Sequence, residues 1–244
     1  MKHVLTYFLA ALWLQASPLT FTGSDAEGRS AKLELEQVGQ QVYMVLTNTS
    51  PNDDFVPIDI LTAVFFQGGE ELVPQAVSLY GPSSVNWGSY DLFGVVGGEW
   101  AFACGLWSDP GACGISSAGF GLFGEADRFP GTNLQGPEAP NGLEYGLSSF
   151  GDNPYTGDAS VTGDFALIWN SIRIVFSLPQ ANTFSLDKIQ EVVFQYGVSI
   201  DDPQILAELE ANSALHHTPE PATIGMVACG LALLGARQFR RKKI

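Results

Sequence analysis

Histidine is almost absent from this chain of 244 residues, which contains three. His3 lies at the N-terminal end, and His216 and His217 lie near the C-terminal end. The body between them can therefore build neither a Ser-His-Asp or Cys-His nucleophile nor a histidine-based metal site. The segment 114–119 resembles a G-x-S-x-G turn only in part, because neither of its serines has glycine on both sides. We therefore expect a protein that is not an enzyme.

Positive charge is scarce, with 11 Lys and Arg residues against 26 Asp and Glu residues and a net charge of −15. Five of the basic residues lie in the last eight positions, so residues 17–218 keep five cations against 25 acidic residues, a net charge of −20. A body this acidic repels nucleic-acid phosphates, which excludes DNA and RNA as partners. A two-carboxylate glycosidase could draw on Glu99, Glu125 and Asp127. Acidic residues on an acidic surface are more often simply solvated, which is the interpretation we favour.

Cysteine is also rare, with three residues in the chain. Cys104 and Cys113 frame the short segment CGLWSDPGAC, in which Asp109-Pro110-Gly111 supplies a turn, whereas Cys229 lies in an apolar stretch. Two cysteines without nearby histidines are too few for a zinc site. The sequence predicts a disulfide between Cys104 and Cys113, formed in an oxidising compartment.

The N-terminal residues 1–16 read as a secretory signal peptide. Lys2 and His3 precede an apolar run over residues 4–14, and Ala16 provides a small residue at its end. This order is typical of a helical leader that the secretion machinery recognises and signal peptidase removes. The mature chain is expected to start near Ser17.

The C-terminal residues have the features of a membrane anchor. Residues 222–236 are uncharged and almost wholly apolar, which as a helix spans about 22 Å against a hydrocarbon core of about 30 Å. The stem of Arg237 and the ring of Phe239 extend this length. The positive-inside rule places the basic end in the cytoplasm and the acidic body outside it. The basic end consists of Arg237, Arg240, Arg241, Lys242 and Lys243.

Pro219-Glu220-Pro221, the apolar stretch and the basic end follow one another in a fixed order. Together they resemble the PEP-CTERM sorting signal of exosortase-dependent surface proteins, found in Gram-negative bacteria that make exopolysaccharide. The resemblance implies an inner-membrane intermediate, processing by an exosortase near the Pro-Glu-Pro motif, and a final place on the cell surface or in the extracellular matrix. The body segments FTGSDAEGRSA, LTNTS, VPIDILTAVFF, GISSAGFGLFGEADRFPGTNLQGP and VVFQYG are similar to one small group of these proteins, and this similarity implies no activity.

Four stretches of the body have strand character, because β-branched and aromatic residues are frequent in them and the period of two dominates. The inward residues of the clearest stretch are Ile172, Ile174 and Phe176. We expect an all-β domain over residues 17–200, an antiparallel β-sandwich with a jelly roll as the alternative. Asp202-Pro203 predicts the start of a short helix within 201–215, followed by a linker to residue 218. The four stretches cover residues 31–48 (a hairpin with its turn at 38–40), 57–67, 165–178 and 189–200.

Residues 81–164 have a different character, since they hold 18 of the 27 glycines. Such a density of glycine excludes regular helix and predicts long ordered loops with short strands. Trp87, Trp100 and Trp107 lie in this region, where each could pack in the core or, if exposed, stack on a sugar.

Three Gly-Asp pairs follow one another at a spacing of six residues. Their aspartates are Asp152, Asp158 and Asp164, which could bind a hard cation such as calcium. Gly-Asp is equally common in plain turns, so both interpretations stay open.

These observations lead to one main hypothesis and one alternative. The first is a non-enzymatic, exported surface or matrix protein that an exosortase sorts through its tail. The alternative is a carbohydrate-binding module, calcium-assisted or without any cofactor, that acts on extracellular polysaccharide.

Overall fold

The computed structural model describes residues 18–157, 159–163, 165–179 and 184–210. Strands dominate these residues, with one short α-helix, α1 (Ala159–Thr162), and five single 3₁₀ turns. The strands are β1 (Leu19–Ser24), β2 (Ser30–Val38), β3 (Gln41–Asn48), β4 (Leu61–Gln67), β5 (Val73–Leu79), β6 (Ser84–Asn86), β7 (Ala101–Cys104), β8 (Ala112–Ser116), β9 (Leu147–Ser148), β10 (Leu167–Trp169), β11 (Ser171–Ser177), β12 (Gln190–Tyr196), β13 (Gln204–Leu206) and β14 (Glu208–Leu209). The 3₁₀ turns are η1 (Pro57–Asp59), η2 (Gly97–Glu99), η3 (Leu106–Ser108), η4 (Glu125–Asp127) and η5 (Leu186–Lys188).

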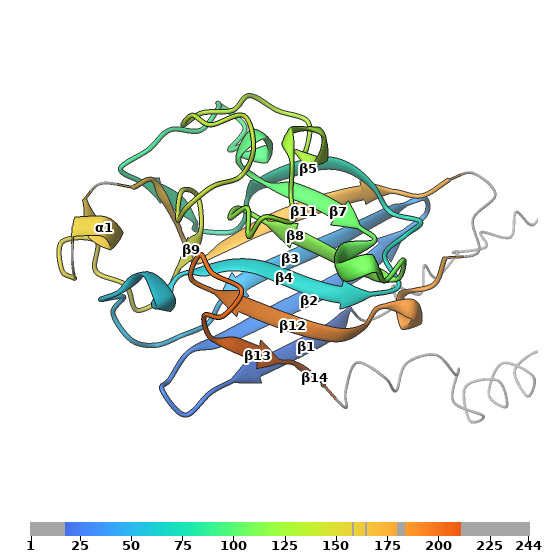
Figure 1. Cartoon of the computed structure of the whole chain (residues 1–244), viewed down its shortest axis with the longest axis horizontal. Helices are drawn as coiled ribbons and strands as arrows, with labels where there is room; N and C mark the ends of the chain where they lie inside the picture. Colours follow the sequence, from blue (N-terminus) through green and yellow to red (C-terminus); the bar gives the residue numbers. More distant parts are fainter. Residues whose placement is uncertain (1–17, 158, 164, 180–183, 211–244) are drawn as a thin grey trace, which may run out of the picture.

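The strands form two sheets (Figure 1). The first has six strands in the order β14-β1-β2-β3-β11-β5, and all its pairs are antiparallel. The second has eight strands: six follow the order β13-β12-β4-β9-β10-β6, and β8 joins β7 to β4 at its side. Its strands are also antiparallel except for the β9–β10 pair. The prediction of an all-β body with antiparallel sheets is confirmed.

One hydrophobic core receives side chains from both sheets. In β2 and β3 alternate residues are buried, as the period of two predicts, and Ile172, Ile174 and Phe176 of β11 are fully buried as expected. From the second sheet, Val64 and Phe66 join the same core. Burying one such side chain contributes about 1.5–3 kcal/mol, so this shared core is the main source of stability.

The hairpin expected over residues 31–48 is present, whereas the stretch 165–178 is not one strand. Asn170 has a left-handed φ of 79° and divides it into β10, which belongs to the second sheet, and β11, which belongs to the first. Asparagine tolerates this conformation better than most residues. The backbone oxygen of Asn170 accepts a hydrogen bond from the Asn48 N–H at 3.0 Å, which fixes the crossing between the sheets.

The helix predicted within residues 201–215 is wrong for its described part. Residues 204–209 form β13 and β14, and residues 211–215 lie outside the described residues. Asp202, the expected helix cap, instead accepts hydrogen bonds from the Val198 and Ser199 N–H groups at 2.9 Å each, which closes a turn. Ile205 then pairs with β12 and becomes 4 % exposed, so burial in the sheet outweighs helix propensity. The folded body therefore extends past the expected boundary at residue 200.

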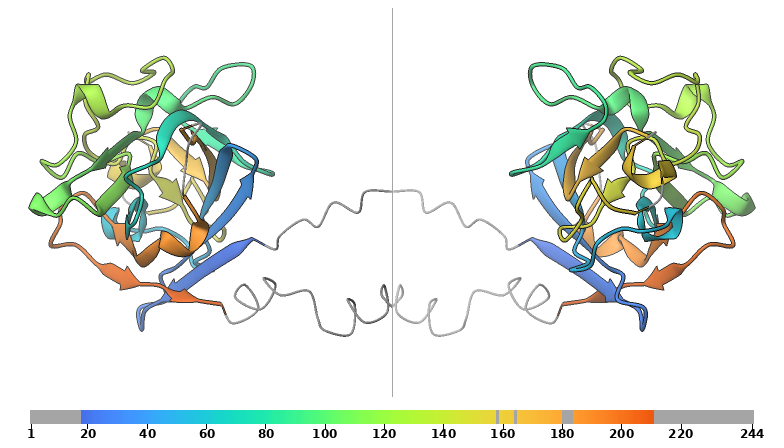
Figure 2. Two further views of the ribbon diagram at one scale, coloured as in Figure 1. Left: turned by 90° about the vertical axis from the view of Figure 1, so that its right-hand side faces the viewer. Right: turned by 90° about the vertical axis from the view of Figure 1, so that its left-hand side faces the viewer.

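The strands β13 and β14 also join the two sheets at one edge. β13 pairs with β12 of the second sheet, and β14 pairs with β1 of the first. Gly23 allows this approach, because a Cβ atom there would lie 2.7 Å from Cγ2 of Ile205. The start and the end of the described body consequently lie side by side, and the Glu210 N–H donates to the Thr20 oxygen at 2.9 Å (Figure 2).

The described part of the glycine-rich region 81–164 forms the predicted loops and short strands. The expectation that it holds no regular helix is wrong at one place, because α1 (Ala159–Thr162) lies within it. Within the described residues no helix has both the length and the hydropathy needed to cross a membrane. The expected leader 1–16, the sorting motif Pro219-Glu220-Pro221, the anchor helix and the basic end all lie outside those residues.

Candidate functional site

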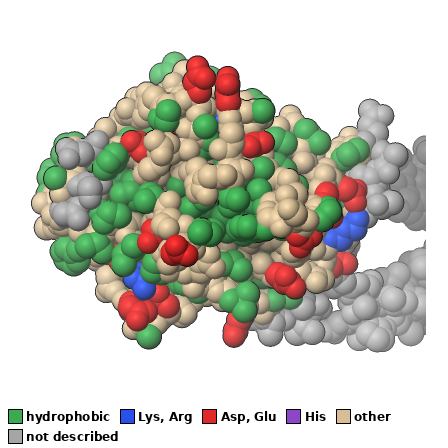
Figure 3. Space-filling view, in the orientation of Figure 1, with side chains coloured by type: hydrophobic (Ala, Val, Ile, Leu, Met, Phe, Trp, Pro, Cys, Tyr) green, Lys and Arg blue, Asp and Glu red, His purple; other side chains and the backbone are tan. Residues whose placement is uncertain are grey.

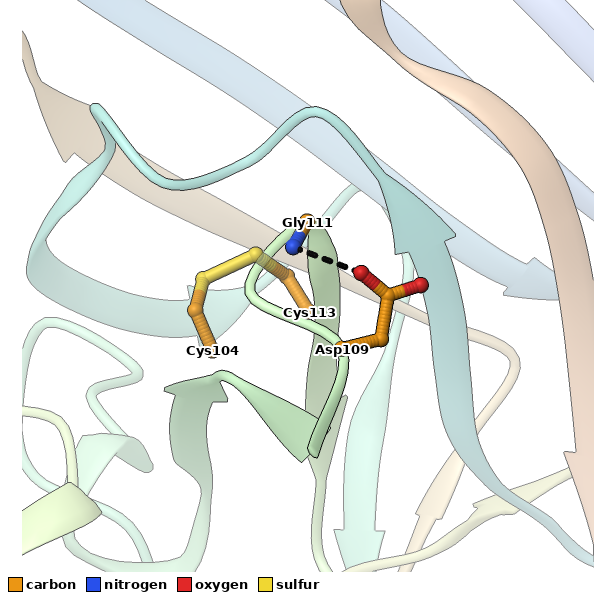
Figure 4. Close-up of a disulfide and its surroundings, with 4 residues drawn as sticks. All are labelled: Cys104, Asp109, Gly111 and Cys113. Atoms are coloured by element: carbon orange, nitrogen blue, oxygen red, sulfur yellow. Dashed lines mark hydrogen bonds between the residues drawn. A yellow bond between two sulfur atoms is a disulfide. The ribbon is translucent and has the colours of Figure 1, made fainter. Parts of the chain in front are cut away.

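The predicted disulfide between Cys104 and Cys113 is present. The two cysteines face each other in the β7–β8 ladder, so the bond closes the loop between these strands (Figure 4). Asp109 forms the expected turn, since its Oδ1 atom accepts a hydrogen bond from the Gly111 N–H at 3.0 Å. The disulfide and this turn hold the loop in one conformation.

Trp107 is the aromatic residue that this loop presents to solvent. Its side chain is 53 % exposed, and its ring meets the ring of Phe65 edge-on at 5.0 Å. The backbone φ is 52° at Trp107 and 64° at Ser108, in the left-handed region that bulky residues rarely adopt. Such strain persists only where surrounding structure imposes it, and it is concentrated at functional sites. Here the closed loop imposes it.

A groove of about 710 Å³ lies beside Trp107 on the face of the second sheet that points away from the shared core. Alternation in β4 produces this face, because Val64 and Phe66 join the core while Phe65 packs in a separate cluster. Figure 3 shows apolar side chains gathered across the middle of this face, with acidic residues beside them. The apolar walls of the groove include Phe65, Trp107, Val193 and Leu206, and its polar groups are Gln67, Asp109, Glu191 and Gln204.

Glu191 reaches the groove from an irregular part of β12. The pairing of β12 with β4 shifts register between Gln190 and Val193, and Glu191 has a left-handed φ of 49°. An irregularity of this kind redirects a side chain relative to a regular strand. Two of the groove residues, Trp107 and Glu191, are thus held in an unfavourable backbone conformation.

The two glutamines of the groove are fixed by hydrogen bonds. Gln67 Nε2 donates to Asp109 Oδ2 at 2.9 Å, and this bond ties β4 to the disulfide loop. Gln204 Nε2 donates to Gln195 Oε1 at 2.7 Å and to the Ile200 oxygen at 3.1 Å. A pre-formed groove with an exposed aromatic ring, apolar walls and a few fixed polar groups has the composition of a small-molecule site.

Two of the three carboxylates considered for a glycosidase, Glu99 and Asp127, have structural roles. Glu99 is 5 % exposed, accepts hydrogen bonds from the Leu134 and Gln135 N–H groups and lies 4.0 Å from Arg128. Burial raises the pKa of Glu99. Asp127 caps η4 by accepting from the Gly124 N–H at 2.7 Å, and Glu125 lies in the same turn. Glu99 therefore fastens a loop from inside the body.

Of the three aspartates proposed for calcium, Asp152 lies in the described residues, and Asp158 and Asp164 lie outside them. Asp152 lies beside Asp53 and Asp54, and burial raises the pKa of Asp152 to about 6 and that of Asp54 to about 8. Asp54 Oδ2 accepts from the Ser149 N–H at 2.7 Å, which attaches this loop to the body. No three His, Cys, Asp or Glu side chains of the described chain come together as a metal site.

The sequence named Trp107 as one of three tryptophans that could stack on a sugar, whereas Gln67, Glu191 and Gln204 gave no signal. These residues come from three separate strands or strand ends, and only the pairing of β4, β12 and β13 brings them together. Of the other two tryptophans considered for sugar stacking, Trp100 is buried and Trp87 is 51 % exposed.

Comparison with known proteins gives no relative. No family model matches the chain. No curated protein matches it, and no solved structure does.

Proposed function

We propose that this protein is an exported, non-enzymatic surface protein that an exosortase sorts through its C-terminal tail. The leader, the Pro-Glu-Pro motif, the apolar stretch and the basic end support this in their order along the chain. The observation that carries the proposal from the structure is the Cys104–Cys113 disulfide, because such bonds persist in oxidising compartments and are rare in the cytosol. Signal peptidase, the secretion machinery, the exosortase and the membrane are the partners that follow.

Intact mass spectrometry of the protein from its host envelope tests this proposal. We expect a chain that starts near Ser17, ends near Pro219 and is lighter by two hydrogens for the disulfide. A mass that retains residues 222–244 would mean a permanent anchor instead of a processed sorting tail. A mass that retains residues 1–16 would contradict export through the leader.

We further propose that the body is a β-sandwich rather than a jelly roll, and that residues 222–236 form a membrane-spanning helix. The support for the sandwich is the main hydrophobic core, to which both sheets contribute. The support for the helix is the uncharged apolar composition of that segment. An experimental structure of the processed body and of the full chain in a bilayer would test both statements.

Glycan binding in the groove is the second function that we propose, and one specific observation favours it. The disulfide loop holds Trp107 half-exposed beside fixed amide and carboxylate groups. An aromatic face can pack on the apolar face of a pyranose ring while neighbouring polar groups bond its hydroxyls. In an exported protein such a groove suits extracellular polysaccharide.

A glycan array tests this second function with matched variants. We expect Trp107→Ala to lose binding and Trp87→Ala, which removes an equally exposed tryptophan elsewhere, to retain it. Running the array with calcium and with a chelator tests the calcium-assisted form of the hypothesis. Binding that Trp107→Ala retains would assign the site to some other surface.

A further inference from the structure

We propose that the groove beside Trp107 selects sugar chains that carry no negative charge, whether neutral or amine-bearing, and rejects acidic polysaccharides. This inference rests on the glycan binding proposed above and specifies its ligand. Two features of the groove carry it: the hydrogen-bonding atoms that are not engaged within the protein, and the charges around the groove.

The groove has few free donors, chiefly the indole Nε1–H of Trp107 and one amide N–H of Gln67. Gln204 uses both N–H bonds of its amide on Gln195 and Ile200, and Gln67 uses one of its two on Asp109. Three of the four amide N–H bonds of the two glutamines are therefore engaged within the protein. The amide oxygens and the carboxylates of Asp109 and Glu191 are all acceptors. A ligand that satisfies these groups must donate hydrogen bonds, as hydroxyl and ammonium groups do.

The charges of the groove are negative. Both ionisable residues that line it, Asp109 and Glu191, are acidic. No lysine or arginine is among the described residues that line it. Acidic sugars are recognised through bidentate arginine or through lysine, and the groove offers neither.

The few cations of the described body are engaged elsewhere. Lys188 precedes β12, but its Nζ atom is paired with Glu71 at 2.5 Å. Arg29, Lys32 and Arg128 pair with acidic residues, and Arg173 lies over the ring of Tyr43 at 5.9 Å. A uronate or sulfate in the groove would face like charges without a counter-charge, which opposes binding strongly.

Trp107 and Glu191 have separate roles in the proposed selection. Both side chains are held in place by backbone that is unfavourable for non-glycine residues. Trp107 supplies the surface on which a ring stacks, and Glu191 supplies the charge that discriminates between ligands. The stacking surface and the charge come from two different side chains of one groove. Substitutions are therefore expected to change the affinity and the charge selection separately.

The experiment is a glycan panel in which α- and β-linked hexasaccharides are each presented in neutral, amine-bearing and uronate forms. The full chain is used in a detergent without a sugar headgroup, so that the detergent does not compete. We expect uronate forms to bind at least about tenfold more weakly than their neutral counterparts at low salt, with the difference shrinking as salt screens the charges.

Two variants identify the source of the selection. Glu191→Gln is expected to raise the affinity for uronate forms by about threefold or more while neutral forms change less than about twofold, since only a charge is removed. Glu27→Gln removes an exposed acid from the β1–β2 loop and should leave the ratio unchanged. Thermal unfolding of both variants confirms that they fold.

The outcomes separate the two proposals. Uronate forms that bind as tightly as neutral forms overturn the charge selection and leave glycan binding in place. A full panel without any binding overturns both. Selection that persists unchanged in Glu191→Gln overturns the role of this groove residue in it.

Discussion

The ring of Trp107 stands edge-on to the ring of Phe65 at 5.0 Å, although 42 residues separate them. Phe65 belongs to the rigid β4 strand, and Trp107 belongs to a loop that the Cys104–Cys113 disulfide closes. The contact therefore fixes a loop residue against the sheet. A ring held in this way loses little conformational freedom when a ligand packs on it.

Removing the disulfide should reduce both stability and binding. Closing a loop of this length contributes about 2–3 kcal/mol by the chain-entropy estimate, so the double variant Cys104→Ser, Cys113→Ser should unfold at lower urea concentration. Trp107 should also lose its fixed position and glycan affinity with it. Urea unfolding followed by circular dichroism measures the first effect. Wild type treated with a reductant is the matched control, and an unchanged midpoint in both would contradict the prediction.

The strained backbone at Glu191 predicts a stabilising substitution. Glycine adopts a left-handed φ without steric cost, so Glu191→Gly should raise the free energy of unfolding by about 1 kcal/mol. Glu191→Ala removes the same charge but keeps a Cβ atom, so it should not show this gain. Equal stability of the two variants in urea unfolding would show that the conformation is not strained.

The acidic cluster at Asp54 predicts that stability falls as pH rises. Burial raises the pKa of Asp54 to about 8 and that of Asp152 to about 6 in the folded protein, whereas an unfolded aspartate titrates near 3.9. The folded state therefore binds more protons than the unfolded state above about pH 4. This contribution to stability is complete below about pH 4 and is lost progressively up to about pH 8. The slope should be steeper below pH 6, where both groups contribute, and approaches about 1.4 kcal/mol per pH unit for each proton.

Asp54→Asn tests this pH dependence. The amide oxygen can still accept from the Ser149 N–H, so the fold is retained while the titration is removed. Urea midpoints at pH 5, 6, 7 and 8 should decline in the wild type and flatten between pH 6 and 8 in the variant. Identical pH profiles for the two proteins would show that Asp54 does not titrate in this range.

Adjacent residues of β11 should differ sharply in their tolerance of alanine. Ile174 is fully buried in the shared core, so Ile174→Ala should cost about 2–5 kcal/mol through the lost contacts and the cavity. Arg173 faces solvent, and Arg173→Ala should change stability by less than about 1 kcal/mol. Chemical unfolding of the two variants measures the contrast. A similar loss of stability in both variants would contradict the assignment of Ile174 to the inward face of β11.

The parts of the fold that were predictable depend on local alternation. β2, β3 and β11 have one face in the core, and their period of two marks that face directly in the sequence. The helix predicted for residues 201–210 is wrong, because their apolar spacing fits a helix as well as a strand. Their pairing with β12 and β1 decides for the strands. The crossing at Asn170 was missed because apolar, strand-forming residues continue on both sides of it.

The site was predictable to a smaller degree, and for a similar reason. The cysteine pair and the turn at Asp109 are local features, so the closed loop around Trp107 could be anticipated. Glu191 faces the groove through an irregularity in strand pairing, and Gln204 reaches it only because residues 204–206 pair with β12. Neither the irregular pairing of β12 nor the pairing of residues 204–206 with β12 can be recognised in one amino-acid sequence.

The joining of the two sheets by β13 and β14 has a mechanical consequence. A pull on the chain beyond Glu210 acts first on β14, whose two residues pair with β1, and next on β13. Gln204 and Leu206 of β13 are walls of the groove. Peeling these short strands one pair at a time would open the groove before the main ladders yield. If the groove binds glycan as proposed above, tension on a chain tethered at this end would release the glycan while the core and the disulfide stay intact.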